Sequence, residues 1–376
     1  MIGALWKKQL ILATALAAVL ISIIYLESLK PERTSKIQTI KPSGEERKVI
    51  ADQKAKEFER AKEIISPSGF INSEPFELIN LIGKKVILVD FWTYSCINCQ
   101  RTTPYLNAWY EKYKDKGLEI VGIHTPEFDF EKKYENVLSA VKKFNIKYPV
   151  VQDNEYATWT AYGNRYWPRK YLIDIDGFVV YDHIGEGGYE ETEKKIQELL
   201  EERMEALAMK NGEEIPRDTV RPEISTDTDF SKPRSPEIYF GASRNSALGN
   251  GIKSRTGLQN LKVPQEIAQD TLNLDGEWNF TQEHSENKSA GAKIIFKFTG
   301  KNVYFVARSN HGVRIKILID RKTPGEAKGE DINPEGFLTI KEDRLYNLIR
   351  GKDYGEHTLE IIIESPGLQA FTFTFG

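Results

Sequence analysis

Cysteine is scarce in this sequence, which has two in 376 residues, Cys96 and Cys99. A framework of structural disulfides needs more cysteines at wider spacing, so two cysteines exclude such a framework. A zinc site needs four ligands, and the nearest of the five histidines, His124, is far from the cysteines in sequence. For two cysteines spaced C-x-x-C, redox chemistry is the leading interpretation.

An excess of charge of one sign is also missing. The chain has 52 Lys and Arg against 55 Asp and Glu, a formal net charge of −3. Without a basic excess, we expect no nucleic-acid partner, and interspersed charges are typical of a solvated surface. The hydrophobic fraction of 40% is enough for packed cores. The length suits about two domains and a tail.

A long apolar run lies near the N-terminus. Residues 9–26 carry no charged side chain and follow Lys7 and Lys8. A run of 18 residues is near the lower limit of about 17 for a membrane-spanning helix. No small-residue cleavage site follows it, which favours an uncleaved signal anchor over a cleaved signal peptide. We therefore expect residues 1–8 in the cytoplasm and a single-pass cell-membrane protein whose remaining chain is extracytoplasmic.

The rest of the chain divides by its patterns. We expect a spacer and lead-in helix at 27–65, a first domain at 66–209, a linker at 210–236 and a second domain at 237–376. In the first domain, predicted strands at 85–92, 118–124, 147–151, 171–175 and 178–183 alternate with predicted helices at 96–116, 130–144 and 189–209. A short hairpin is expected at 70–79. Parallel strands joined by helices, followed by an antiparallel pair, indicate an α/β fold.

The second domain has no long helical pattern. Residues 292–298, 302–307, 313–319, 357–365 and 369–375 each have the composition of a strand, with turn residues between them. Many short strands with turn signals predict an all-β sandwich, jelly-roll-like in form.

The cysteine pair lies where the strand 85–92 ends and a helix begins. The free amides and the dipole at a helix N-terminus favour an anion, so we expect Cys96 to be partly thiolate. Its thiolate would attack a substrate disulfide, and Cys99, one turn further on, would resolve the mixed disulfide. Asp90 lies six residues before Cys96 on the strand beneath it. A buried carboxylate there would accept the proton that Cys99 must lose.

The segment VDFWTYSCINCQRT, residues 89–102, resembles the thioredoxin superfamily, in its TlpA/ResA-like membrane-anchored branch and the redoxins. The similarity covers about residues 66–209. It implies a thioredoxin fold, with Cys96 as the nucleophile, Cys99 as the resolving thiol and Asp90 as the buried acid. It also implies that Pro168, at the start of a later strand, is a cis proline that faces the cysteine pair.

One position departs from the ResA-like pattern. Those proteins carry a glutamate three residues after the second cysteine, where this chain has Thr102. The acid role would then fall to Asp90, or to Glu127 in the loop that begins at His124. His124 and Glu127 follow a strand end in the expected active-site layer, and both a functional and a purely structural role stay open for them.

The strings VDFWTYSCINCQRT, GIHTPEF, RLYNLIR and FTFTFG also resemble the C-terminal part of the DipZ family, over about residues 66–376. That resemblance implies a carbohydrate-binding-module-like β domain with a glycan ligand. Five aromatic residues would be candidates for stacking on sugars, although aromatics in a sandwich are more often core: Tyr239, Phe240, Trp278, Tyr304 and Tyr346. DipZ proteins carry a CcdA-like electron-transfer domain in front. A separate CcdA-like membrane protein is therefore the expected electron donor if this chain acts as a reductant.

The leading function is a thiol–disulfide oxidoreductase acting on exported proteins, with reduction of apocytochromes c as one TlpA-like example. A peroxiredoxin-like thiol peroxidase is an alternative, because Thr93 and Cys96 match its T-x-x-C motif. Against it, Val89 stands where peroxiredoxins have proline, and Pro168 stands near the place of their arginine. A non-enzymatic glycan or wall tether is the third candidate. No cofactor or metal is expected, and the Asp174-Ile-Asp-Gly stretch indicates a hairpin turn rather than a calcium loop.

Overall fold

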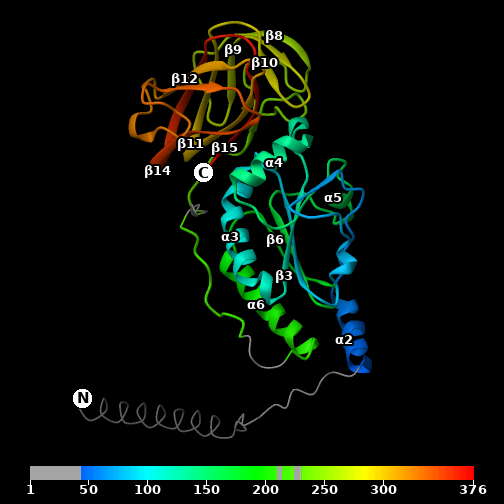
Figure 1. Ribbon diagram of the computed structural model, residues 1–376. Helices are drawn as coiled ribbons and strands as arrows, with labels where there is room; N and C mark the ends of the chain where they lie inside the picture. Colours follow the sequence, from blue (N-terminus) through cyan, green and yellow to red (C-terminus); the bar gives the residue numbers. More distant parts are fainter. Residues whose placement is uncertain (1–43, 210–213, 224–228, 230) are drawn as a thin grey trace, which may run out of the picture. The chain divides into compact units, whose positions relative to one another are not determined.

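The computed structural model describes residues 44–209, 214–223, 229 and 231–376 (Figure 1). The predicted spanning helix at residues 9–26 and the segment 1–8 lie outside these residues. Within the described part of the chain, no helix is both long enough and apolar enough to cross a membrane. The described residues belong to one compact unit, Ser43–Gly376.

The first half of the chain forms a six-stranded sheet. In spatial order its strands are β1 (Gly69–Ile71), β4 (Val150–Gln152), β3 (Leu118–His124), β2 (Val86–Trp92), β5 (Arg169–Ile173) and β6 (Val179–Ile184). Strands β4, β3 and β2 run parallel, while β1, β5 and β6 run antiparallel to their neighbours. This mixed arrangement confirms the predicted α/β class.

Strand β2 is at the centre of the sheet, and all seven of its residues are buried. Because side chains alternate along a strand, Ile87, Val89 and Phe91 pack on one face of the sheet. Val86 and Leu88 pack on the other face, within a second cluster of buried residues. A strand with both faces covered needs a near-continuous apolar run, which is why residues 85–92 signal a strand so clearly.

Helices cover the two faces of this sheet. The helices are α2 (Gly44–Glu57), α3 (Ile97–Tyr113), α4 (Tyr134–Lys143), α5 (Ala157–Ala161) and α6 (Tyr189–Ala206). Figure 1 shows α3 and α6 on one side of the strands and α5 on the other. Leu106 of α3 and Ile196 of α6 join the cluster around Leu88, while Trp159 of α5 packs on the opposite face. The cysteine-bearing helix is therefore fixed against the sheet by its apolar side.

Two predictions for this half were wrong. The hairpin expected at 70–79 does not form, because β1 pairs with β4, and residues Leu78–Asn80 are a short 3₁₀ helix. The lead-in helix expected up to residue 65 ends at Glu57. Arg60 then forms a bridge with Phe178 beside the sheet. In both places a long-range partner took backbone groups that local patterns assigned elsewhere.

The second half of the chain is an all-antiparallel β domain. Its strands are β7 (Ile238–Tyr239), β8 (Gly257–Leu261), β9 (Leu272–Phe280), β10 (Ser285–Asn287), β11 (Ala292–Arg308), β12 (Val313–Ile319), β13 (Phe337–Ile340), β14 (Arg344–Ile363) and β15 (Gln369–Phe375). They enclose one large apolar core. Residues 292–298 and 302–307, predicted as two strands, are one strand, β11, with a register shift between Gly300 and Asn302. The predicted strand 357–365 is the second half of β14.

The aromatic residues weighed as a sugar platform are mainly core residues. Phe240 and Trp278 are 0% exposed, Tyr346 is 1% exposed and Tyr304 is 7% exposed. Tyr239 is partly buried and packs against a core cluster. Three of these rings lie in the core of the β domain, and Tyr304 lies in the buried cluster shared with the first domain. Buried rings offer no face to a sugar, so these four residues are not a stacking platform.

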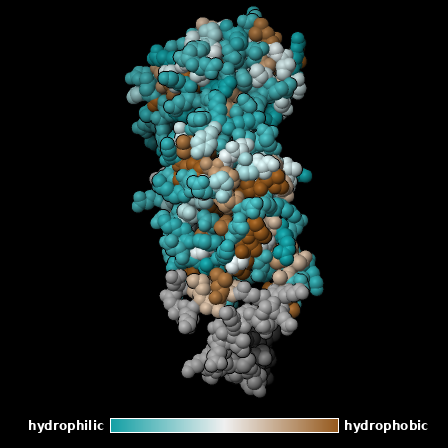
Figure 2. Space-filling model, turned by 45° about the vertical axis from the view of Figure 1, so that its right-hand side comes forward, coloured by the Kyte–Doolittle hydropathy of each residue, from teal (hydrophilic) through white to brown (hydrophobic). Residues whose placement is uncertain are grey.

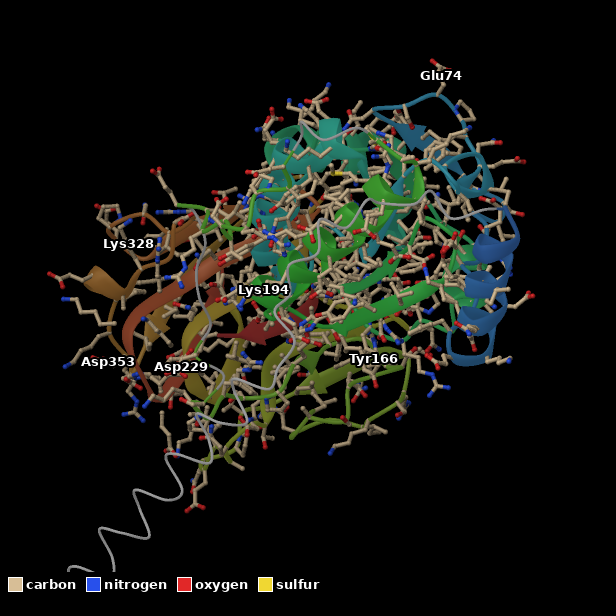
Figure 3. All side chains as sticks on the ribbon, turned by 90° about the horizontal axis from the view of Figure 1, so that it is seen from below. Glu74, Tyr166, Lys194, Asp229, Lys328 and Asp353 are labelled. Atoms are coloured by element: carbon tan, nitrogen blue, oxygen red, sulfur yellow. The ribbon has the colours of Figure 1, made fainter. Side chains whose placement is uncertain are left out.

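The surface is mixed in character. Hydrophilic residues dominate the face drawn in Figure 2, and hydrophobic residues gather on it in separate patches. Single exposed apolar side chains are ordinary on a protein surface. One of them, Tyr166, is 50% exposed and is labelled in Figure 3.

Candidate functional site

Cys96 is the residue that caps the N-terminus of α3. Its backbone is extended, and its Sγ accepts a hydrogen bond from the amide of Cys99 at 3.4 Å. The side chain is partly exposed. An amide donor and the positive end of the helix dipole both stabilise negative charge on sulfur. The structure therefore places Cys96 where a nucleophilic thiolate is expected.

The peptide between Trp167 and Pro168 is cis, as expected from the resemblance. The carbonyl oxygen of Trp167 lies 3.9 Å from the Sγ of Cys96 and accepts a hydrogen bond from it. The indole of Trp167 donates to the carbonyl of Thr125 at 3.0 Å and packs on Trp159. The proline loop thus lies directly against the first cysteine and is tied to the loop after β3.

Cys99 lies one turn into α3 and is 2% exposed. Burial raises the pKa of its thiol well above the usual value, and the hydrogen bond and charge of Cys96 add to the rise. The thiol of Cys99 therefore needs a base before it can attack. Thr102, at the position of the ResA-like glutamate, cannot serve. Its hydroxyl donates to the carbonyl of Asn98 at 2.9 Å and lies 3.3 Å from the hydroxyl of Tyr189.

Asp90 lies on the same face of β2 as Leu88, the face that α3 covers, and its charge acts on Cys99 of that helix. It is 2% exposed, and its Oδ1 has no hydrogen-bond partner among the residues that the structure describes. Burial raises the pKa of Asp90 to about 7, although the positive charge of Lys170 lowers it. A carboxyl group with a pKa near neutrality can both accept and return a proton, as the resolving step requires.

Lys170 is a buried cation that the sequence analysis did not single out. It is opposite Asp90 in the register of β5 and β2 and is fully buried. Its ammonium donates to the carbonyl of Gly185 at 3.1 Å. Burial lowers the pKa of Lys170, and the negative charges of Asp90 and Cys99 oppose that effect. Strand alternation was the available signal, because Lys170 lies at an inward position two residues after Pro168.

His124 is the last residue of β3 and is fully buried. Its ring meets Trp92 edge-on at 5.1 Å and stacks on Tyr94 at 5.7 Å. Its Nε2 lies 3.5 Å from the hydroxyl of Thr93. Burial lowers the pKa of His124 to about 3, so the ring is neutral at physiological pH. These contacts give His124 a packing position beneath the loop that leads to Cys96.

Glu127 has its carboxylate in an ion pair across the two domains. Its Oε1 accepts hydrogen bonds from Arg244 at 2.6 Å and from the hydroxyl of Tyr239 at 3.0 Å. Both partners belong to the β domain. Glu127 lines the same cleft as Cys96. The structure thus places Glu127 in the lining of the cleft that contains Cys96.

Glu131 is a second residue that the sequence analysis missed. It is fully buried and binds the residue before the nucleophile, because its Oε1 accepts from the amide of Ser95 at 3.2 Å and from its hydroxyl at 2.6 Å. Its Oε2 accepts from the amides of Glu127 and Phe128 at 2.6 and 3.0 Å. Burial raises the pKa of Glu131 to about 7. Glu131 lies in the short 3₁₀ helix Asp129–Lys132, before the start of α4. A glutamate within the helix predicted at 130–144 gave no sign of this role.

Comparisons with known proteins match this architecture. A Redoxin family model matches residues 52–200, and a model of a thioredoxin-like C-terminal domain matches residues 235–376. The thiol-disulfide oxidoreductase ResA of Bacillus thuringiensis is 35% identical over 129 residues, which are 34% of this chain and 71% of ResA. This chain belongs to the redoxin branch of the thioredoxin superfamily.

Protein DipZ of Mycobacterium bovis is 35% identical over 315 residues, which are 82% of this redoxin and 42% of DipZ. The chain thus spans less than half the length of that relative. Among solved structures, the thioredoxin domain of a thiol-disulfide oxidoreductase from Bacteroides vulgatus is 26% identical, with a TM-score of 0.32 over 37% of this chain and 96% of that one. At 82% of the chain, the DipZ similarity extends over both domains.

Cys96 of the redoxin opens into a cleft of about 470 Å³. The first domain contributes Ser95, Cys96, Asn98, Glu127, Arg165, Tyr166 and Trp167 to its lining. The end of the linker contributes Arg234, Ser235 and Pro236, and the β domain contributes Glu237, Tyr239, Arg244, Thr372, Thr374 and Phe375. Access to the nucleophile therefore depends on both domains.

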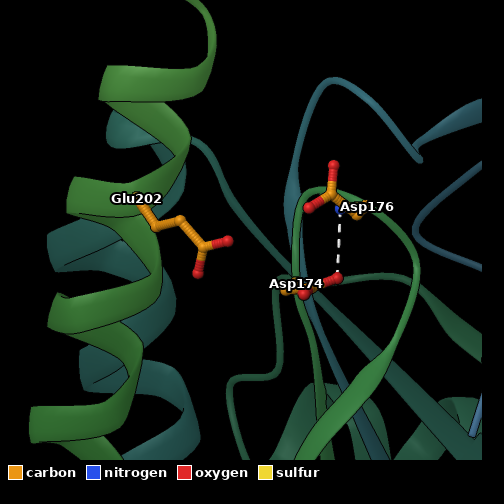
Figure 4. A group of neighbouring side chains, drawn as sticks. All are labelled: Asp174, Asp176 and Glu202. Atoms are coloured by element: carbon orange, nitrogen blue, oxygen red, sulfur yellow. Dashed lines mark hydrogen bonds between the residues drawn. The ribbon is translucent and has the colours of Figure 1, made fainter. Parts of the chain in front are cut away.

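A group of three acidic side chains lies away from the cysteines (Figure 4). Asp174, Asp176 and Glu202 have carboxylate oxygens within 4.8 Å of one another. The ammonium of Lys54 lies 2.6 Å from Asp174 and 2.9 Å from Asp176, and it also contacts Glu202. The oxygens thus already have a cation, which ties α2 to the β5–β6 turn and to α6. Asp174 also accepts from the amides of Asp176 and Phe178, as the predicted hairpin turn requires.

Proposed function

We propose that this redoxin is a thiol–disulfide oxidoreductase that exchanges disulfides of exported proteins through Cys96 and Cys99. The observation that carries the proposal is the pairing of a partly exposed sulfur at a helix N-terminus with a buried sulfur one turn behind it. A relative named as a thiol-disulfide oxidoreductase, ResA, supports the same activity. We infer the site to be Cys96, Cys99, Asp90 and Pro168, with His124 and Glu127 in supporting positions.

The first step is the attack of the Cys96 thiolate on one sulfur of a substrate disulfide. A bond forms between Cys96 and that sulfur, and the other substrate sulfur leaves as a thiolate, which takes up a proton. We infer that the substrate approaches on the side of the Trp167 carbonyl, which lies beside the sulfur of Cys96.

The second step is the attack of Cys99 on the Sγ of Cys96. The Cys99 thiol first gives its proton to the carboxylate of Asp90. The new thiolate forms the Cys96–Cys99 disulfide, and the second substrate thiolate is released. Lys170 keeps the buried charge balanced, because its ammonium is opposite a carboxylate before the proton moves and near a thiolate afterwards. The substrate gains two electrons, and the enzyme dithiol loses them.

The cellular setting completes the proposal. The apolar run at 9–26 supports a single-pass anchor, with a thioredoxin-like domain at 66–209 and the β domain at 237–376 on the extracytoplasmic side. The DipZ similarity supports a separate CcdA-like protein as the electron donor when the chain acts as a reductant. A glycan ligand of the β domain is supported by that similarity alone. Reduction of exported apoproteins, including apocytochromes c, fits this setting.

The test is a redox titration of the chain from residue 44 onward against glutathione or dithiothreitol, with Cys99→Ser as the control that cannot form the pair. A reversible Cys96–Cys99 disulfide with a potential near about −270 mV indicates a reductant. A value near about −120 mV indicates an oxidant that introduces disulfides. Failure to form a reversible disulfide contradicts the proposal and favours the tether. Rapid turnover of hydrogen peroxide by Cys96 alone favours the peroxidase.

A further inference from the structure

Half of the cleft that leads to Cys96 is built by the β domain. On that side the lining takes in the end of the linker at 234–236, Glu237, Tyr239 and Arg244, and the end of β15, and the first domain supplies the rest. We propose that the β domain is the substrate-selecting half of this active site, and that the cleft admits a disulfide only on an extended, unfolded polypeptide segment. This inference rests on the proposed oxidoreductase activity and names its substrate class.

We call the part of the cleft lining that the β domain supplies the wall. The wall is firmly attached to the first domain. Phe371 of β15 meets the rings of Phe128 and Phe130 at 5.0 and 4.9 Å. Phe371 belongs to the same buried cluster as Cys99 and Leu106. A shared apolar core resists separation, since opening it would expose aromatic surface to water. The cleft therefore keeps its width when substrate arrives.

Polar contacts reinforce the attachment around the site. Tyr94, two residues before Cys96, donates a hydrogen bond from its hydroxyl to the carbonyl of Asp343 at 3.1 Å. Arg101 of α3 is buried and donates to the hydroxyl of Tyr304 at 3.2 Å. These bonds fix the β domain to the strand end and to the helix that position the two cysteines.

The charged side chains that the β domain places on the cleft already have polar partners. Arg244 pairs with Glu127 and stacks over the ring of Tyr239 at 3.8 Å. The hydroxyl of Tyr239 is within hydrogen-bond distance of both Glu127 and Glu237. A small anionic thiol would find Arg244 of this cluster already paired with Glu127. An extended peptide needs no such charge, because backbone groups and ordinary side chains give it sufficient contacts.

Size excludes the disulfides of folded proteins. The cleft volume of about 470 Å³ is typical of a site for a small ligand or a short chain segment. Three or four residues of extended chain span about 10–14 Å and fit such a space. A folded domain of 100 residues has a radius of gyration of about 13 Å and cannot enter. Its disulfide would have to reach past the β domain to the partly exposed Cys96.

The rim gives an unfolded chain a place to bind. Tyr166 is next to Trp167, is 50% exposed and lines the cleft (Figure 3). Unfolded segments expose apolar side chains that folded proteins bury, and an exposed aromatic ring packs well on them. Unfolded substrates are therefore selected in two ways. The β domain excludes folded proteins, and Tyr166 at the rim binds exposed apolar side chains.

The experiment compares one disulfide in two states, using the described chain from residue 44 onward. The substrates are a small domain with a single disulfide and a core variant of that domain that is unfolded in buffer. Each rate of reduction is divided by the rate with dithiothreitol, which corrects for the exposure of the disulfide. We expect the unfolded substrate to have a corrected kcat/KM at least about tenfold higher. Equal corrected values, or a preference for glutathione disulfide, would overturn the proposal.

Variants test the wall itself. Arg244→Ala shortens a side chain that lines the cleft and so widens the space beside Cys96. The corrected rate for the folded substrate should therefore rise severalfold relative to the unfolded one. The matched control is Arg314→Ala, which removes an arginine paired with Glu364 and stacked over Phe337 at 3.9 Å, away from the cleft lining. An equal effect of both variants would contradict the role of the wall.

Two further measurements keep the test decisive. Tyr166→Ala changes an exposed side chain, so it avoids a folding defect, and we expect it to lower the rate for the unfolded substrate severalfold. The reaction of Cys96 with a small aryl disulfide monitors the dithiol in every variant. If the unmodified chain fails to react with the aryl disulfide, the proposed oxidoreductase activity is contradicted. If it reacts normally but shows no preference for the unfolded substrate, only the proposed substrate selection by the cleft is contradicted.

Discussion

The two faces of the six-stranded sheet are built from alternate residues of the same strands, yet they differ in kind. The face that carries Val89, Phe91 and Tyr171 packs into a cluster of apolar and aromatic side chains. The opposite face carries Asp90 and Lys170, which are 2% and 0% exposed, as direct sequence neighbours of those residues.

The buried charges lie on the face of the sheet that is next to Cys99. Buried ionisable groups destabilise a core unless they are paired, so a sheet built for stability alone would keep them on its surface. Here they lie beneath Cys99 on one face, although both faces also have apolar packing. Both faces thus stabilise the domain, and the face beneath Cys99 also carries the charges that support the chemistry.

The largest expected effect on stability comes from a substitution on the face opposite Asp90. Phe91→Ala removes a ring that packs edge-on against Trp159, Tyr162 and Tyr171. We expect the free energy of unfolding to fall by about 3–5 kcal/mol, measured by urea denaturation. The rate of the Cys99 step should stay unchanged under native conditions. A strong loss of that rate with little loss of stability would break the distinction between the faces.

A substitution one residue earlier should do the reverse. Asp90→Asn keeps the size of the side chain but removes the base for Cys99, and we expect the second step to slow by about 100-fold at pH 7. Rapid-quench analysis of the mixed disulfide at Cys96 measures that step. Asp182→Asn, on β6 at the surface, is the matched control and should leave it unchanged. Equal rates in Asp90→Asn and the unmodified chain would contradict the role of Asp90.

His124 should impose a pH dependence on stability rather than on catalysis. Its pKa is about 3 in the folded chain and about 6.5 in the unfolded chain, so below pH 6.5 only the unfolded chain gains the proton. Stability is therefore lost as the pH falls, by about 2 kcal/mol from pH 6.5 to pH 5. His124→Phe should remove this part of the dependence, as followed by urea denaturation across that range. The same slope in both proteins would rule out His124 as its source.

Much of the fold could be predicted because its signals are local. The apolar run of β2, the strand 118–124 and the C-x-x-C spacing each have one natural interpretation. The pairing of β1 with β4 could not be predicted, since it joins segments about eighty residues apart by backbone bonds alone. The wall of the cleft could not be predicted either, because it depends on how two domains meet.

The candidate site was predicted where chemistry is tied to sequence position. Cys96, Cys99, Asp90 and the cis proline follow from motif spacing and resemblance. Lys170 and Glu131 were missed because lysine and glutamate are the residues most often found at the surface, so their burial gives no sign in composition. Their roles depend on register and loop packing, which the single sequence does not reveal.

The most direct test of the account is the pH dependence of the Cys99 step in Lys170→Met, compared with Arg169→Met. Arg169 is the adjacent residue, with its side chain paired to Asp182 instead of facing Asp90. The account predicts a transition near pH 7 in the unmodified chain and in Arg169→Met. In Lys170→Met the transition should move to higher pH, with a rate about tenfold lower at pH 7, because an isolated carboxyl holds its proton more tightly. Coincident profiles in all three proteins would contradict the claim that the charged face of the sheet serves Cys99.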